Sequence, residues 1–332
     1  MRSDLVVRLF LALSALPCLA NAQSVATLAL VPTGDREVGA VSPASGAVSL
    51  PGSPINGGSS LSTSSGVNAL DPTGNRFFFV GSTDAGSTWK LFRIHPGTGA
   101  VLGSPTLSGG STSLDGIQYD DGEGVLYALA SVASGDRQLA TVDIATGAVT
   151  LLFSPIAGGS LPSVSGGDDL DAAGNRYFFV GSPGGTERIY TVDTATGVVT
   201  SPVLSGATIN GIQGLEYDPG EAVLYALASV GGSFDRQLAT INPATGAVTL
   251  LGAPIAGMSL LTTSGNDTLD PAGNRYYFTG QPSGGNWKIY AINTTNGAVA
   301  TNPDLSGDST TLFGLEWDAG ALPVELLGVR VD

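Results

Sequence analysis

Carboxylate and amide side chains recur at equivalent places along this chain of 332 residues. Each lies in or just before a short motif that ends in aspartate: NALD, DDLD, DTLD, GIQYD, GLEYD and GLEWD. Mixed carboxylate and amide oxygens suit Ca²⁺, so the pattern predicts an axial cation if the fold gathers these groups. The alternative is that the side chains alternate toward neighbouring strands and bond loop amides. The candidate metal ligands are Asn68, Asp168, Asp267, Glu216 and Glu316, with Gln118 and Asp169 beside them.

Aromatic and basic side chains form a second candidate set, at the ends of three polar loops. Two loops end in Trp-Lys, and the third ends in Glu187 and Arg188. A tryptophan beside a polar loop can stack on the apolar face of a sugar ring, whereas the alternative is that it packs against the adjacent blade. The candidate ligand-binding residues are Trp89, Lys90, Arg188, Trp287 and Lys288.

Residue counts exclude several other chemistries. His95 is the only histidine and occupies a recurring turn position, so a histidine-dependent triad is not expected. Cys18 is the only cysteine, which leaves no zinc site of the usual ligand set. With 13 basic and 28 acidic residues, the net charge of −15 opposes binding to nucleic acid or anionic lipid. We therefore expect a protein or carbohydrate ligand, and no nucleic acid partner.

The elements that must position these residues belong to a repeat of about fifty residues. DPTGNRFFF at Asp71 recurs as DAAGNRYFF at Asp171 and as DPAGNRYYF at Asp270, and a related motif with LYALAS lies between them. Each unit predicts four strands: a short one ending at the aspartate, an apolar one, a third such as KLFRI, and a fourth after a hairpin such as DIATGAV. Six such hairpins indicate six units.

Six four-stranded units without a helical segment predict an all-β fold, a six-bladed β-propeller. The first unit starts at ATLALV, residues 26–31, and lacks its own first strand, whereas FGLEWDAG, residues 313–320, is a first strand with no unit after it. We therefore expect the C-terminal strand to pair in the N-terminal blade and close the ring. Closure predicts that the acids and amides of the first strands meet around one axis. A monomer is expected.

The two ends of the chain lie outside the repeats. Residues 1–22 have basic residues, an apolar run and an AxA site, as a secretory signal does. The propeller would then span residues 23–320 and a tail residues 321–332. No later stretch is long and apolar enough to cross a membrane. We expect a location outside the cytoplasm: secreted, at the cell surface or in the periplasm.

Two stretches resemble known families. RIYTVDTATGVVT, residues 188–200, is similar to the LYxIDxxTGxVT hairpin of bacterial secreted propellers of the NHL and YVTN kind, and the resemblance covers nearly the whole mature chain. That superfamily includes lactonases, lyases, glycosidases and binding scaffolds, so the resemblance implies the fold and no single activity. LPVELL, residues 322–327, resembles the short junction near the start of C-terminal regions in many secreted Bacteroidota proteins.

Three functions remain open at this level. The first is a binding or interaction module, because the conspicuous motifs serve ring geometry. The second is a hydrolase or lyase that uses axial carboxylates, with or without Ca²⁺. The third is a structural component of an envelope or extracellular matrix. Carboxylates converging in an axial pocket would favour the enzyme, and carboxylates dispersed on a flat face would favour binding.

Overall fold

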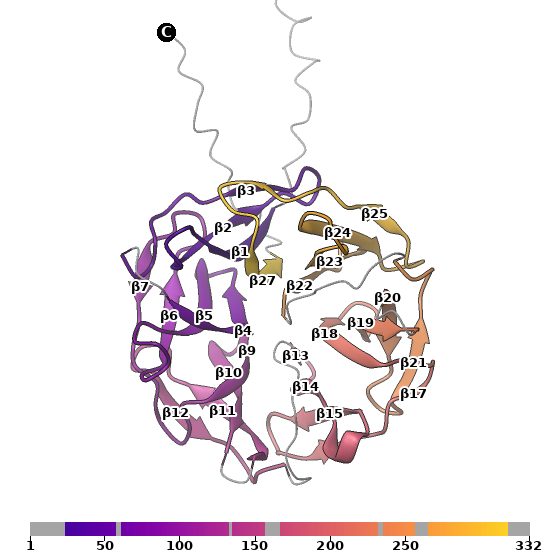
Figure 1. Cartoon of the computed structure of the whole chain (residues 1–332). Helices are drawn as coiled ribbons and strands as arrows, with labels where there is room; N and C mark the ends of the chain where they lie inside the picture. Colours follow the sequence, from indigo (N-terminus) through magenta and orange to yellow (C-terminus); the bar gives the residue numbers. More distant parts are fainter. Residues whose placement is uncertain are drawn as a thin grey trace, which may run out of the picture.

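The computed structural model describes residues 24–57, 61–132, 135–156, 167–231, 235–255 and 265–317. Six small antiparallel sheets are arranged in a ring around a central axis (Figure 1). The described part of the chain contains strands and short turns but no α-helix, and none of its helical segments is long and apolar enough to cross a membrane. The all-β, six-bladed architecture expected from the repeats is confirmed.

The blades follow one another along the chain. They are numbered 1 to 6 in the order in which their second strands occur. Blade 1 contains β1 (Val25–Leu30), β2 (Arg36–Val41) and β3 (Ala47–Ser49). Blade 2 contains β4 (Ser62–Asp71), β5 (Arg76–Ser82), β6 (Lys90–Ile94) and β7 (Val101–Gly103). Blade 3 contains β9 (Leu114–Asp120), β10 (Val125–Ser131), β11 (Arg137–Val142) and β12 (Ala148–Leu151).

The second half of the ring repeats this order. Blade 4 contains β13 (Asp168–Asp171), β14 (Arg176–Gly181), β15 (Arg188–Asp193) and β16 (Val199–Thr200). Blade 5 contains β18 (Gly211–Asp218), β19 (Val223–Val230), β20 (Asp235–Ile241) and β21 (Ala247–Leu250). Blade 6 contains β22 (Asp267–Asp270), β23 (Arg275–Gly280), β24 (Lys288–Asn293) and β25 (Val299–Thr301).

The last described strand, β27 (Leu312–Trp317), closes the ring. It pairs antiparallel with β1, with Ala26 opposite Glu316, and so becomes the innermost strand of blade 1. Each innermost strand also contacts its two neighbours around the axis, in the order β27, β4, β9, β13, β18 and β22. The predicted closure by the C-terminal strand is therefore confirmed.

Three blades have five strands, where the sequence predicted four. The connections that leave blades 2, 4 and 6 each form a two-residue strand: β8 (Ser108–Gly109), β17 (Ser205–Gly206) and β26 (Ser306–Gly307). Each pairs in parallel with the outermost strand of the next blade, β12, β21 and β3 respectively. Two residues are too few to give a strand periodicity, so the pattern could not reveal them. These short strands join the blades into pairs: 2 with 3, 4 with 5, and 6 with 1.

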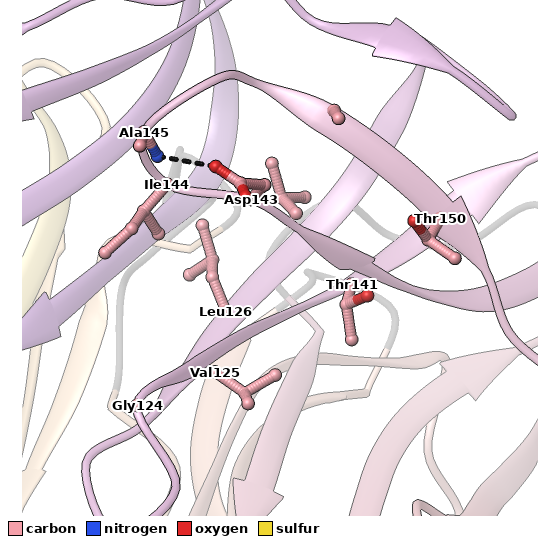
Figure 2. Close-up of a pocket in the computed structure, with 10 residues that line it drawn as sticks. Gly124, Val125, Leu126, Thr141, Asp143, Ile144, Ala145 and Thr150 are labelled. Atoms are coloured by element: carbon pink, nitrogen blue, oxygen red, sulfur yellow. Dashed lines mark hydrogen bonds between the residues drawn. The ribbon is translucent and has the colours of Figure 1, made fainter.

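Tight turns at one end of the ring, the turn face, connect the third strand to the fourth in each blade and the first strand to the second in blades 2 to 6. In blade 1 the first strand, β27, comes from the other end of the described chain. In the third-to-fourth hairpins the predicted left-handed glycines are present, such as Gly147 with φ 75°. Asp143 caps that turn by accepting 2.9 and 2.8 Å hydrogen bonds from the amides of Ala145 and Thr146 (Figure 2). The second-to-third loops and the blade connections therefore lie at the opposite end, the loop face.

In the first-to-second turns, a residue other than glycine can take the left-handed conformation. In the turn after Asp71 the left-handed residue is Asn75, with φ 49°, and not Gly74. Glycine is needed at position 74 for space, because a Cβ there would lie 2.2 Å from Asp71 Oδ2. Arg76 pairs with the same carboxylate at 2.5 Å and donates to the Tyr119 hydroxyl of blade 3 at 3.0 Å. Arg76 thus forms an ion pair within its own blade and a hydrogen bond to the next blade.

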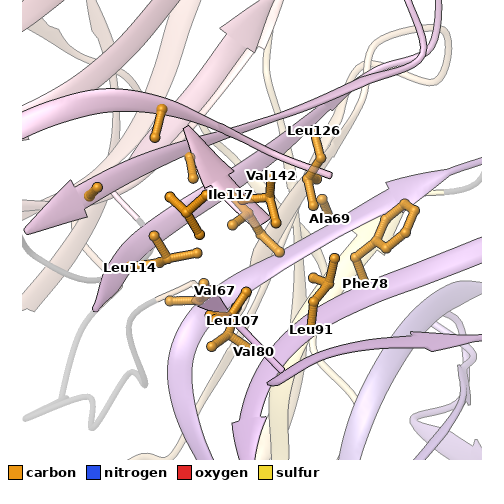
Figure 3. Close-up of a cluster of buried hydrophobic side chains, with 14 residues drawn as sticks. Val67, Ala69, Phe78, Val80, Leu91, Leu107, Leu114, Ile117, Leu126 and Val142 are labelled. Atoms are coloured by element: carbon orange, nitrogen blue, oxygen red, sulfur yellow. The ribbon is translucent and has the colours of Figure 1, made fainter. Parts of the chain in front are cut away.

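The hydrophobic cores lie at the six junctions between neighbouring blades. Second strands face two junctions at once: Phe77 and Phe79 pack in the cluster shared with blade 1, whereas Phe78 and Val80 pack in the cluster shared with blade 3. Figure 3 shows the latter cluster, where side chains of both blades meet. Burial on both faces explains why these strands have continuous apolar sequences.

The predicted signal at 1–22, the tail at 321–332 and the last repeat aspartate, Asp318, lie outside the described residues.

Candidate functional site

The predicted acids and amides lie on the innermost strands, and each even-numbered blade points one of them at a glycine of the preceding blade. A Cβ at Gly116 would lie 2.2 Å from Asp168 Oδ1, and a Cβ at Gly214 would lie 2.0 Å from Asp267 Oδ2. A Cβ at Gly314 would lie 2.5 Å from Asn68 Oδ1. These glycines are conserved in position within the repeat because a side chain there would exclude the neighbouring carboxylate or amide.

Another acid or amide follows each of these glycines by two residues: Glu316, Gln118 or Glu216. The three junctions differ in how this residue meets the glycine-facing group. Asn68 donates a 2.7 Å hydrogen bond to Glu316, so an amide meets an acid. At the second junction Asp168 meets an amide residue, Gln118, which donates to the Asp168 backbone oxygen at 3.0 Å. At the third junction both residues, Asp267 and Glu216, are acids.

The two glycine-facing aspartates also bond to tyrosine hydroxyls of their own blades. Tyr177 donates to Asp168 at 2.5 Å, and Tyr276 donates to Asp267 at 2.7 Å. Phe77 takes the corresponding place beside Asn68. The aspartates thus occur with tyrosine and the asparagine with phenylalanine. The sequence contains this covariation between repeats, which could have identified the two tyrosines as partners of the aspartates.

The residues that follow the glycine-facing groups point to the next blade around the ring. Asp169 accepts hydrogen bonds from the amides of Leu170, at 2.7 Å, and Tyr217. Thr268 occupies the same slot in blade 6 and accepts from the Trp317 amide at 2.7 Å. Alternation of side chains toward neighbouring blades was the alternative to an axial ligand set, and these contacts follow it.

Burial and like-charge repulsion raise the pKa values of the carboxyl groups around the axis. Burial is the first cause in each case: it raises the pKa of Asp267 and of Asp169 to about 7 and that of Glu316 to about 8. The pKa values of Asp168 and Glu216 are raised well above their ordinary range, also by burial first. Asp169, Asp267 and Glu316 then add like-charge repulsion at Glu216. Glu216 is only partly buried by surface area.

The described residues contain no group of three or more His, Cys, Asp or Glu side chains arranged to hold a metal ion. Tyrosine hydroxyls bond the oxygens of Asp168 and Asp267, and the Asn68 amide bonds Glu316. Each contact occupies one carboxylate oxygen of Asp168, Asp267 or Glu316, and the calcium site stays a prediction.

The second candidate set occupies equivalent positions in blades 2, 4 and 6, at the loop-face ends of β6, β15 and β24. These ends are on three alternate blades. Trp89 and Trp287 are half-buried and pack against the clusters shared with blades 3 and 1. Lys288 forms an ion pair with Asp304, and Arg188 donates to the Ser201 oxygen at 2.6 Å. Lys90 pairs through its backbone with Thr106.

Three hollows in the described surface lie away from the axis. One of about 460 Å³ lies on blade 3 between its two turns and includes Leu126, Thr141 and Asp143 (Figure 2). The Asp143 carboxylate is already used as a turn cap, so this hollow offers no free charged group. A second, of about 530 Å³, lies beside Phe153 and Tyr190 at the outer edge. A third, of about 480 Å³, lies on the loop face between blades 4 and 5 and contains Glu187.

Comparisons with known proteins agree with this geometry. No protein-family profile matches the chain, and no curated protein is similar to it in sequence. A chain from a nidogen–laminin complex superposes with a TM-score of 0.60 at 12% identity, over 88% of this chain and 97% of that one. The chain is a six-bladed β-propeller. TolB from Acinetobacter baumannii gives a TM-score of 0.61 at 14% identity, over 89% of this propeller and 66% of TolB.

A putative 6-phosphogluconolactonase from Bacteroides uniformis also resembles the propeller, with a TM-score of 0.50 at 12% identity over 84% of this chain and 81% of that one. At these identities the likenesses show the fold alone. They include a protein crystallised with a binding partner and a protein named as an enzyme, so they do not choose between the two functions.

Proposed function

We propose that this propeller is a secreted or cell-surface binding module that recognises a protein or glycan on its loop face. The observation that carries the proposal is how the axial polar groups are used. Asn68 bonds Glu316, Asp168 bonds Tyr177, and Asp267 bonds Tyr276, so these groups hold neighbouring strands together. Chemistry on a substrate would require breaking these contacts.

The loop face, by contrast, varies among otherwise equivalent blades. The residue before the third strand is Trp89 in blade 2, Glu187 in blade 4 and Trp287 in blade 6, on one repeated scaffold. Variable side chains on loops held by a rigid scaffold are typical of recognition surfaces. Nearby Lys90 adds positive charge to a surface that is acidic overall, and so favours an anionic group on the ligand, whereas the charge of Lys288 is paired with Asp304.

Affinity electrophoresis through gels containing defined acidic or neutral polysaccharides tests this proposal. We expect retardation by at least one polysaccharide, and its loss in the variant Lys90→Glu with Lys288→Glu. The matched control is Glu123→Lys, an exposed turn-face change that should leave retardation intact. Equal retardation of all three proteins would place the ligand elsewhere and overturn the loop-face assignment.

One observation favours the alternative, a carboxylate-based hydrolase or lyase. Glu216 and Asp267 interact electrostatically, and burial keeps their pKa values raised, as a general acid requires. A lactone and glycoside panel assayed with wild type and Glu216→Gln tests it. Turnover that the substitution abolishes would make the propeller an enzyme. Unchanged or absent turnover leaves the binding module as the proposal.

A further inference from the structure

The hollow between blades 4 and 5 occupies the place of a tryptophan side chain. Glu187 in blade 4 corresponds to Trp89 and Trp287, because the backbone oxygen of each accepts from a leucine amide in the following connection. The donors are Leu107 at 2.9 Å, Leu204 at 3.0 Å and Leu305 at 2.7 Å. The next residue in each case forms the same antiparallel bridge to that connection. The backbone pairing at this position is therefore alike in the three blades, whereas the side chain differs.

The change from tryptophan to glutamate uncovers the apolar surface beneath it. Leu107 and Leu305 are 3% and 5% exposed in blades where tryptophan packs over the same cluster. The equivalent Leu204 is only partly buried. Figure 3 shows Leu107 and Leu114 within the cluster at the blade 2–3 junction, the cluster against which Trp89 packs. At the blade 4–5 junction the corresponding surface lines an open hollow of about 480 Å³.

The connection that borders this hollow is also longer than its counterparts. Eight residue steps separate Leu204 from Ile212, whereas seven separate Leu107 from Leu114 and Leu305 from Leu312. Ile212 and Leu114 are equivalent, since they pair with the equivalent residues Ala228 and Ala130. The longer connection contributes Ala207 and Ile209 to the apolar wall and Asn210 to the rim.

Glu187 gives the hollow its only carboxylate among the lining residues. The carboxyl group is half-buried, and the backbone amide of Ile212 bonds to it. None of the ion pairs found in the described residues involves Glu187. A half-buried carboxylate beside apolar walls lacks a cation at short range, and the net charge of −15 draws cations toward the protein.

We propose that the hollow bounded by Glu187, Leu204, Ala207 and Ile209 binds a small aromatic amine, whose ring takes the place of the missing indole and whose ammonium group pairs with Glu187. This inference goes beyond the proposed binding function, because it adds a small-molecule site on the loop face. A flat ring replaces the apolar contacts that Trp89 and Trp287 make in their blades. The charged hydrogen bond to a partly desolvated carboxylate supplies the selectivity.

Isothermal titration with tryptamine, which combines an indole ring and an ammonium group, tests the site. We expect one site per chain at pH 8, and binding about tenfold weaker for Glu187→Gln, because a charge-assisted bond is lost. Tryptophol, the uncharged analogue, should bind wild type and Glu187→Gln equally. Glu187→Trp should fill the hollow and abolish tryptamine binding, and the exposed change Glu123→Gln should have no effect.

Two outcomes overturn the proposal: no tryptamine binding to wild type, or equal binding to wild type, Glu187→Gln and Glu187→Trp. Circular dichroism of each variant excludes misfolding as the cause of a loss. The polysaccharide experiment fails or succeeds independently. Lost tryptamine binding with retained polysaccharide retardation rejects this site alone, whereas the reverse result rejects the proposed polysaccharide recognition and keeps the amine site.

Discussion

Asn68 donates a 2.7 Å hydrogen bond to Glu316 across the junction where the ring closes, although 248 residues separate them in the chain. We expect Asn68→Asp to lower the free energy of unfolding by about 2 kcal/mol at pH 8, because a second acid would face Glu316 without a donor. The loss should be smaller at pH 5, where protonated carboxyl groups can donate. Denaturant unfolding measures both values. Glu316→Gln in the same chain should restore stability, and a variant pair without coupling would contradict the bond.

Removal of the closing strand should be far more costly than removal of the tail. A chain ending at Thr311 lacks β27 and leaves the inner edge of β1 unpaired. We expect its Tm to fall by several degrees, since a lost strand costs several kcal/mol and each kcal/mol shifts Tm by roughly 2 °C in a chain of this size. The control ends at residue 320. If the shorter chain melted within about 2 °C of the control, closure by β27 would contribute little to stability.

The axial acids should make the protein less stable as the pH rises. The pKa values of Asp267 and Glu316 in the fold are about 7 and about 8, above the ordinary value of about 4 for unfolded carboxyl groups. Below pH 4 these groups are protonated in both states, so the shift costs nothing. Between pH 4 and 8 the unfolded chain ionises first, and the free energy of unfolding falls.

Unfolding measured across that range should show the decline, and Glu216→Gln with Asp267→Asn should flatten it. Asp84 is an exposed control, because its hydrogen bonds to Ser82 and Thr88 lower its pKa to about 2. Asp84→Asn should leave the slope between pH 5 and 8 unchanged. A wild-type stability that rises over this range would show that the axial carboxyl groups are ionised in the fold.

Trp89 and Trp287 should be partly accessible to a neutral quencher. Both are half-buried on the loop face, so in a Trp317→Phe background acrylamide should quench their fluorescence less than it quenches free tryptophan. Addition of a bound polysaccharide should reduce the quenching if the rings act as a sugar platform. Complete protection without ligand would leave that platform no surface.

Calcium on the axis remains a proposal, and calorimetry on chelator-treated protein decides it. We expect no binding heat at pH 6, because protons and tyrosine hydroxyls already satisfy Asp168 and Asp267. The comparison variant is Asp168→Asn with Asp267→Asn. Heat from wild type that this variant abolishes would establish the cation predicted from the sequence.

Most of the fold could be predicted from the repeat. Six hairpins, an unpaired last strand and a first unit lacking its inner strand were enough to predict six blades and their closure. The short parallel strands were missed, because pairs such as Ser108 and Gly109 have no periodicity and pair only once the ring forms. Sequence periodicity identifies strands long enough to show an alternation of side chains. It does not identify short strands that form only by pairing with a neighbouring blade.

The placement of the axial side chains on the innermost strands could be predicted from the sequence, but their hydrogen-bond partners could not. The slots of Asn68, Asp168 and Asp267 follow from the repeat, so their convergence could be inferred. Which partner each group meets depends on blade spacing, which the sequence does not express. The exchange of tryptophan for glutamate at position 187 is visible in the sequence. Only the structure shows that it leaves Leu204 partly exposed.

The three two-residue parallel strands give the ring an uneven mechanical character. They bind blades 2 and 3, 4 and 5, and 6 and 1 along their outer edges, whereas blades 3 and 4, 5 and 6, and 1 and 2 lack such a link among the described residues. Under force, each of these three pairs should open at its outer edge only after the short parallel pairing breaks. The hollow that contains Glu187 lies inside one such pair, so its shape should persist while that pairing holds.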